Sequence, residues 1–313
     1  MRASLHLLLC LSLPVISTLQ NSHGSLPTEP IPVKEVAMSE GTVGEVWLCS
    51  GQSNMVVPVS YATDGGDNLF SEPFDVRFYS GGNWVKVDAS NARNLPAVPF
   101  FFALARYRTT AKPVGVIVAA EGGTGIEAWL PPGAMPETDI GRKMKKLSEA
   151  PEVIEAARLD RAEKKLRPYG QHRLAEWGLG RAYPSELYEK KVVPLEGTPI
   201  TGIIWYQGES NANSSAMAAE YDLWLNALIS SWRQLFGEVP FLIVELPNFK
   251  SPTAESPTSW DDLRAAQRRC AAAGSCTYWV PAFDLGDENN IHPTRKRAMG
   301  ERIAEFIQRN QKN

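Results

Sequence analysis

The stretch GEVWLCSGQSNM, residues 44–55, contains a predicted strand and the loop that follows it. Its apolar run from Val46 to Cys49 is typical of a strand that is covered on both faces, as in a parallel sheet. The run ends abruptly in Ser50-Gly51-Gln52-Ser53-Asn54, small and polar residues that suit the point where a buried strand reaches the surface. The stretch therefore raises the question of whether one of its two serines is a nucleophile or part of an ordinary strand-to-helix turn.

Short apolar runs of the same kind recur along the chain, with helical patterns between them. The predicted strands are Val43–Cys49, Asp75–Tyr79, Val114–Ala119, Ile200–Tyr206, Val239–Leu246 and Thr277–Phe283. Apolar residues recur at helical spacing in 221–235 and 299–307, and Pro293 is placed to open the last helix. This alternation predicts an α/β fold with a mostly parallel sheet and helices on both of its faces.

The composition is that of a globular protein. The chain has 313 residues, of which 43% are hydrophobic and 21% charged, which is enough for one large domain with a sizeable core. The net charge of −3 disfavours nucleic acid or an anionic membrane as a partner. We find no internal repeat and no long tract of low complexity.

The first residues have the character of a secretory signal. Arg2 supplies a positive charge, and the apolar stretch 5–16 that follows is too short to span a bilayer. We therefore predict a signal peptide over 1–19, a polar, proline-bearing linker over 20–34, a catalytic domain over 35–313, and a secreted or lumenal location.

The cysteines leave two alternatives open. Cys270 and Cys276 lie close together in the sequence and would form a disulfide in an oxidising compartment, or would remain two free buried thiols. Cys49 is expected to be a buried thiol within its strand.

Four loops that follow predicted strands carry chemically useful residues. Ser53 follows the first strand, Gly122-Gly123 the third and Gln207-Gly208-Glu209-Ser210-Asn211 the fourth, while Asp287 and His292 follow the last. In parallel sheets, ligands bind beyond the carboxyl ends of the strands, so these residues are expected to meet at one edge. A serine, paired glycines, a carboxylate and a histidine are the parts of a serine hydrolase. The competing histidine, His172, is interpreted as part of the solvated face of a charged helix.

Four motifs carry a resemblance to a known family. GEVWLCSGQSNM, GVIVAAEGGTGIEAWLP, GIIWYQGESNA and NNIHPTRKRAMGERIA resemble the sialate O-acetylesterase group of SGNH-type carbohydrate esterases, over about residues 43–307. The resemblance implies a three-layer α/β/α flavodoxin-like fold and removal of O-acetyl groups from sugars without a metal or cofactor. It implies that Ser53 is the nucleophile and His292 the general base. The oxyanion would be bound by the N–H groups of Ser53 and Gly123 and by an amide, Asn211 or Gln207.

The sequence departs from the family pattern next to the histidine. Many relatives have an aspartate two or three residues before it, where this chain has Asn290 and Asn289. The first candidate for the acid that orients His292 is therefore Glu209, the second is Asp287, and the third alternative is a Ser–His dyad. The chain also has little room for the extra β-rich domains of larger relatives.

Three further residues are predicted to bind the substrate, namely Gln52, Asn54 and Trp129, although a tryptophan in EAWLP is equally compatible with the core. Arg264, Arg295 and Lys296 could meet a carboxylate, but solvated surface charge is the commoner interpretation. The leading hypothesis is a secreted O-acetylesterase acting on sialic acid or a related acetylated sugar. The alternatives are a broad short-chain esterase and a sugar-binding protein whose catalysis has decayed.

Overall fold

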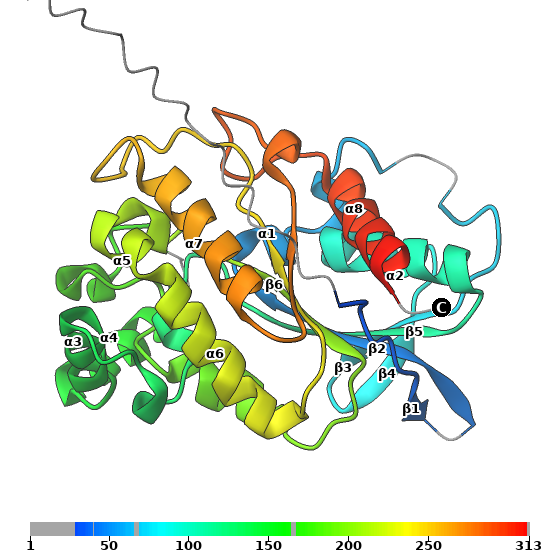
Figure 1. Cartoon of the computed structure of the whole chain (residues 1–313), viewed down its shortest axis with the longest axis horizontal. Coiled ribbons are helices and arrows are strands. Elements are labelled where there is room, and N and C mark those ends of the chain that lie inside the picture. Colours follow the sequence, from blue (N-terminus) through cyan, green and yellow to red (C-terminus); the bar gives the residue numbers. More distant parts are fainter. Residues whose placement is uncertain (1–28, 40, 66–68, 164–166, 312–313) are drawn as a thin grey trace, which may run out of the picture.

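A computed structural model describes residues 29–39, 41–65, 69–163 and 167–311 (Figure 1). The predicted signal peptide, 1–19, and the first part of the predicted linker lie outside the described residues. Within that linker, Ile31 is fully buried, and its N–H donates a hydrogen bond to the Asn310 carbonyl at 2.6 Å. The Lys34 carbonyl likewise accepts from Thr201 Oγ1 at 2.7 Å. The last residues of the predicted linker thus pack on the domain, whose outer boundaries stay a prediction.

The centre of the domain is a mixed but mostly parallel sheet with the strand order β4-β3-β5-β2-β6-β7-β8. Neighbouring strands from β3 to β8 along this order are parallel, whereas β4 pairs antiparallel with β3, and β1 with β2. The strands are β1 Val36–Ser39, β2 Thr42–Gly51, β3 Val76–Ser80, β4 Asn83–Lys86, β5 Val114–Ala120, β6 Gly202–Tyr206, β7 Phe241–Val244 and β8 Thr277–Val280.

Helices cover both faces of this sheet (Figure 1). The helices are α1 Ser53–Val56, α2 Ala97–Thr110, α3 Asp139–Ser148, α4 Pro151–Ala162, α5 Ser215–Ala219, α6 Tyr221–Phe236, α7 Ser259–Ala273 and α8 Lys296–Asn310. Helices α2 and α8 pack against each other on one face, and α6 and α7 pack against each other on the opposite face. The predicted α/β/α class with a mostly parallel sheet is therefore confirmed.

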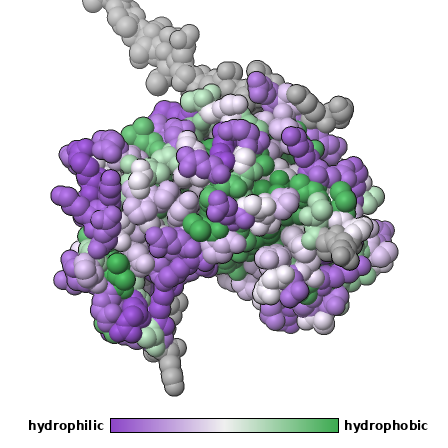
Figure 2. All heavy atoms as spheres, turned by 90° about the horizontal axis from the view of Figure 1, so that it is seen from below, coloured by the Kyte–Doolittle hydropathy of each residue, from purple (hydrophilic) through white to green (hydrophobic). Residues whose placement is uncertain are grey.

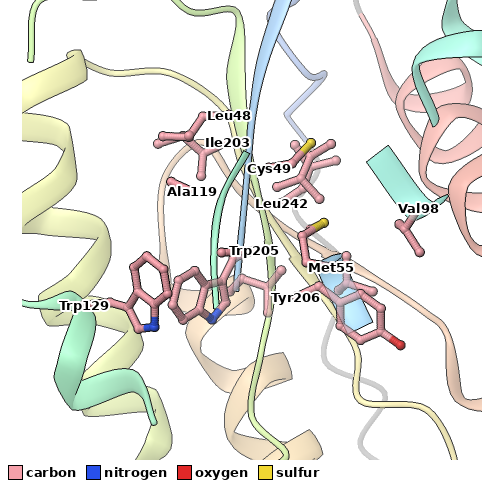
Figure 3. Close-up of a cluster of buried hydrophobic side chains, with 14 of the residues drawn as sticks. Leu48, Cys49, Met55, Val98, Ala119, Trp129, Ile203, Trp205, Tyr206 and Leu242 are labelled. Atoms are coloured by element: carbon pink, nitrogen blue, oxygen red, sulfur yellow. The ribbon is translucent and has the colours of Figure 1, made fainter. Parts of the chain in front are cut away.

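The core is divided by the sheet into two apolar layers, as Figure 3 shows for the strands near β2. On one side, the ring of Trp205 from β6 lies edge-on to Trp129 and to Trp232 of α6. On the other side, Met55 and Tyr206 face α2, where Val98 is labelled. Because side chains alternate along a strand, neighbours such as Trp205 and Tyr206 serve opposite layers.

Each of the six predicted strands is present, but several elements differ from the prediction. Strands β1 and β4 were not expected, and both are four-residue strands outside the parallel part of the sheet. The last helix begins at Lys296, so Pro293 lies three residues before it and does not open it. The interpretation of Cys270 and Cys276 is settled in favour of free thiols, and Cys49 is a buried thiol as expected.

The register of the sheet brings three loops together. Gly51, the last residue of β2, is paired with Ala120 at the end of β5 and with Tyr206 at the end of β6. The chain leaves these three strands at one edge of the sheet, and the order reverses at β2, where β5 lies on one side and β6 on the other. Such a switch point is where open α/β sheets bind their ligands.

Gly51 allows this close approach of loop and strand. It has φ +132°, and a Cβ atom added there would lie 2.0 Å from the Tyr206 carbonyl oxygen. We therefore expect Gly51→Ala to destabilise the domain by more than the roughly 1–3 kcal/mol that such a backbone conformation costs. Denaturant unfolding would measure this loss. Gly133→Ala is the matched control, because Gly133 has open space around its Cα and no positive φ; equal stability of the two variants would contradict the role given to Gly51.

The connection from β5 to β6 carries α3 and α4 and forms a hydrophilic lobe. Figure 2 shows hydrophilic residues gathered on the left, where these helices lie in Figure 1, and hydrophobic residues in a band across the middle. His172 belongs to this connection, but it follows α4 rather than lying on a helix face, and only 6% of it is exposed. Its interpretation as a solvated residue was therefore wrong. Among the described residues, no helix is long and apolar enough to cross a membrane.

Candidate active site

Ser53 and His292 lie in hydrogen-bond contact at the carboxyl edge of the sheet. Ser53 begins α1 directly after the Gly51 turn, and its Oγ is 2.8 Å from Nε2 of His292, in the loop between β8 and α8. Both residues are partly buried. With a neutral imidazole, the hydroxyl donates and Nε2 accepts, which is the arrangement needed to activate a serine.

The paired glycines lie beside the serine. A Cβ atom added to Gly122 would be 3.3 Å from Cβ of Ser53, so the glycine loop lies beside the serine with no room for a side chain at ordinary contact distance. Gly123 has φ +73°, a conformation that glycine adopts without strain. Among the described residues, neither the N–H of Ser53 nor that of Gly123 donates a hydrogen bond to the protein. Both N–H groups are therefore free to bind an external acceptor.

Asn290, two residues before His292, holds the histidine backbone rather than its ring. Asn290 Oδ1 accepts from the His292 N–H at 2.9 Å, and the hydroxyl of Tyr61 donates to the His292 carbonyl at 3.0 Å. Asp287 is exposed and accepts from the N–H of Asn289. Within the described part of the chain, Nδ1 of His292 has no hydrogen-bond partner, so neither Asp287 nor Glu209 is hydrogen-bonded to the imidazole.

Glu209 is instead joined to Asn54, the residue after the serine. Glu209 Oε1 accepts from Asn54 Nδ2 at 2.6 Å, and the same Nδ2 donates to the Ile291 carbonyl at 2.9 Å. The amide oxygen of Asn54 accepts from Nζ of Lys296 at 2.5 Å. Glu209, Asn54 and Lys296 are each at most 1% exposed. The interpretation of Lys296 as solvated surface charge was therefore wrong, and Asn54, with no exposed surface, cannot touch a sugar as predicted.

The charges of this cluster affect one another. Burial raises the pKa of Glu209 to about 7, although the hydrogen bond from Asn54 and the charge of Lys296 oppose the shift. Burial also lowers the pKa of Lys296 to about 8, against the attraction of Glu209 and Asp64. For His292, burial and then the positive charge of Lys296 lower the pKa below its ordinary value. His292 is thus neutral, and able to accept a proton, at neutral pH.

The amides that were predicted to bind the oxyanion or the substrate form a buried network. Gln207 Nε2 donates to Gln52 Oε1 at 3.1 Å and to Asn211 Oδ1 at 2.7 Å, while Asn211 Nδ2 donates to Glu127 Oε2 at 2.9 Å. All four side chains are at most 4% exposed. The network joins the loops after β2, β5 and β6, and oxyanion binding by Gln207 or Asn211 stays a prediction.

Trp129 is part of the core. It has no exposed surface, its Nε1 donates to Thr124 Oγ1 at 3.2 Å, and its ring packs edge-on against Trp205 (Figure 3). The prediction that Trp129 stacks on a sugar was therefore wrong. Arg264 is also buried, at 6% exposed, where it pairs with Asp261 and lies over the ring of Phe283.

Two residues near the serine were not singled out in the sequence, Arg181 and Tyr169. A Cβ atom on Gly123 would meet Cδ of Arg181 at 2.9 Å and Cδ2 of Tyr169 at 3.2 Å, so both side chains lie over the glycine loop. Arg181 donates to the Arg167 carbonyl at 2.8 Å and, among the described residues, has no carboxylate partner. Both belong to the long β5–β6 connection, and only its cluster of basic and aromatic residues could have drawn attention to them.

The described residues contain no group of three or more His, Cys, Asp or Glu side chains placed to hold a metal ion. The residues gathered at the edge are a serine, a histidine, two free N–H groups and a buried amide network. The fold, with its switch point at β2, is of the SGNH type found in the neighbouring solved carbohydrate esterases, and this set of residues is its candidate site among those the structure describes.

Comparison with known proteins agrees with this class. A family model described as a carbohydrate esterase, sialic acid-specific acetylesterase, matches residues 169–309. The sialate O-acetylesterase of Rattus norvegicus is 27% identical over 303 residues, an alignment that covers 83% of this chain and 55% of the rat protein. The resemblance to the sialate O-acetylesterase family is confirmed, and the chain spans about half the length of the curated relatives it matches.

Solved structures are similar over most of the chain. A carbohydrate acetylesterase from Xanthomonas citri has 28% identity and a TM-score of 0.65, covering 85% of this chain and 56% of that one. A protein from Arabidopsis thaliana has 17% identity and a TM-score of 0.53, covering 85% of this chain and 98% of the other. The second likeness concerns the fold alone.

Proposed function

We propose that this protein is a carbohydrate O-acetylesterase that removes acetyl groups from sialic acid or a related acetylated sugar. Support comes from the similarity to carbohydrate acetylesterases over more than four-fifths of the chain. The single observation that carries the proposal is the 2.8 Å contact between Ser53 Oγ and His292 Nε2 beside the unengaged N–H of Gly123. The proposal includes secretion, which rests on the N-terminal sequence.

In the proposed reaction, Ser53 Oγ attacks the acetyl carbonyl carbon while His292 Nε2 accepts the hydroxyl proton. The negative charge that develops on the carbonyl oxygen is bound by the N–H groups of Ser53 and Gly123. When the bond from the acyl carbon to the sugar oxygen breaks, His292 gives its proton to that oxygen. Water then attacks the acetyl-enzyme with the same help from His292, releasing acetate and restoring Ser53.

The acyl chain length tests this proposal. The glycine loop lies against Ser53, so space for the acyl group is limited, and each methylene that is not accommodated costs about 1–3 kcal/mol. We expect kcat/KM to fall steeply from acetyl to butyryl to octanoyl nitrophenyl esters, with acetylated sugars better than any of them. Turnover of the octanoyl ester at a rate equal to that of the acetyl ester would favour the broad esterase. Absence of acetate release from every ester would favour the sugar-binding alternative.

Arg181 favours an acidic sugar over a neutral one. Its guanidinium lies over Gly123 without a carboxylate partner among the described residues, and a sugar carboxylate would supply that partner. We expect Arg181→Met to lower kcat/KM about tenfold for acetylated sialic acid and by less than about twofold for neutral acetylated xylo-oligosaccharide. Arg158→Met is the matched control, since Arg158 pairs with Glu155 on the surface of α4. An equal loss on both substrates would argue against an acid-binding role for Arg181.

A further inference from the structure

Asn54 connects three of the loops that build the site. It follows Ser53 in α1, and its amide contacts Glu209 in the loop after β6, the Ile291 carbonyl next to His292, and Lys296 at the start of α8. The orientation of the amide is fixed, because both hydrogens of Nδ2 face acceptors and Oδ1 faces the ammonium group of Lys296. Asn54 is fully buried, so these bonds are shielded from water.

Glu209 is a buried carboxylate with an oxygen left unpartnered among the described residues, which a purely structural role does not explain. One oxygen is bonded to Asn54, whereas Oε2 has no partner among the described residues although it is buried. The hydroxyl of Tyr206 nearby is likewise buried and without a partner. Burying a carboxylate is costly, which argues that the side-chain hydrogen bond it accepts from Asn54 has a function.

We propose that Asn54 is the positioning residue through which Glu209 and Lys296 hold the His292 loop against Ser53. Glu209 then supports His292 indirectly, by fixing the amide that binds the Ile291 carbonyl, and not by contact with the imidazole. This inference rests on the proposed function. It replaces a direct Ser–His–Glu triad by a Ser–His dyad, in which the loop that carries His292 is held in place by Asn54, Glu209 and Lys296.

The geometry distinguishes two substitutions of the carboxylate. In Glu209→Gln the amide oxygen can still accept from Asn54 Nδ2, so the link to Asn54 is kept while the negative charge is removed. In Glu209→Ala the acceptor is lost, and Asn54 is free to turn. We therefore expect Glu209→Gln to lower kcat by less than about fivefold, and Glu209→Ala and Asn54→Ala to lower it by about 10- to 100-fold with little change in KM, because the histidine is misplaced. A Glu209→Gln variant as impaired as Glu209→Ala would overturn the proposal in favour of a direct role for the charge.

A second test, which does not require enzymatic activity, replaces Lys296 and measures the titration of His292. The charged groups facing Lys296 and His292 are Glu209 from the β6 loop and Asp64 from the loop after α1, while Arg295 is exposed and bonded to the Asp284 carbonyl. The charge of Lys296 lowers the pKa of His292, so Lys296→Met should raise that pKa. NMR titration of the imidazole, identified by its absence in His292→Gln, should show the midpoint moving to higher pH, and the acid limb of kcat/KM should move with it.

Arg295→Met is the control for removing a nearby positive charge, because Arg295 touches neither Asn54 nor His292. Its His292 midpoint should match that of the unaltered protein. If the His292 midpoint is unchanged in folded Lys296→Met, or shifts equally in both variants, the proposed role of Lys296 beside His292 is contradicted. If the unaltered protein releases no acetate from any ester, the proposed function fails, whereas the NMR midpoints still test the coupling of Lys296 to His292.

Discussion

Replacing Ser53 by alanine is expected to reduce acetate release by roughly 10⁴-fold or more while leaving the fold intact. The hydroxyl that contacts His292 at 2.8 Å is the only group this change removes, and the side chain is partly exposed, so the core is not disturbed. Acetate release from a simple acetyl ester measures the effect, with circular dichroism as the check on folding. A folded Ser53→Ala protein that keeps more than about a hundredth of the rate would exclude Ser53 as the nucleophile.

Ser50→Ala, three residues earlier near the end of β2, is the matched control. Ser50 is fully buried, and its hydroxyl donates to the Ala119 carbonyl of the neighbouring strand, away from His292. We expect its loss to lower stability by about 1 kcal/mol and to leave turnover within a few-fold of normal. The opposite ranking, an inactive folded Ser50→Ala and an active Ser53→Ala, would assign the nucleophile to Ser50.

Replacing His292 by glutamine should have an effect of similar size. Glutamine cannot accept the serine proton and return it to the leaving sugar oxygen, so both halves of the reaction lose their proton carrier. Because the serine and histidine act as a unit, the double variant Ser53→Ala/His292→Gln should be little worse than either single variant. Steady-state kinetics of the three proteins measure this, and additive losses would show that the two residues act independently. His172→Gln is the control, since neither ring nitrogen of His172 makes a hydrogen bond among the described residues.

The parallel strands could be predicted because burial on both faces leaves a continuous apolar run. The prediction failed for β1 and β4, which lie outside the parallel part of the sheet and are only four residues long. In β4 the pattern is weak because Val85 is 46% exposed and Asn83 and Lys86 are polar. Each is joined by two residues to the strand beside it, β1 to β2 and β4 to β3, so only the antiparallel pairing across a short connection, and no apolar run, marks it as a strand.

Which loops meet could also be predicted, because strand ends in a parallel sheet share an edge, and Ser53 and His292 do lie together. The direction of individual side chains could not. Asn54 and Trp129 lie in the expected loops but point inward, and Lys296, one of several basic residues in its stretch, is buried. Its burial depends on an acceptor from Asn54 and a carboxylate from Glu209, residues 242 and 87 positions away in the sequence.

The connection between β5 and β6 adds no strand to the sheet, yet it supplies Arg181 and Tyr169 beside the serine. Ser53 and His292 come from other connections, at the ends of β2 and β8. Under the proposed function, the side chains that meet the sugar lie in a different stretch of the chain from Ser53 and His292, although the same connection also supplies Gly123. Under that proposal, substitutions at Arg181 and Tyr169 would alter which sugar is bound while leaving Ser53 and His292 unchanged, so relatives with this architecture would differ in substrate and share one reaction.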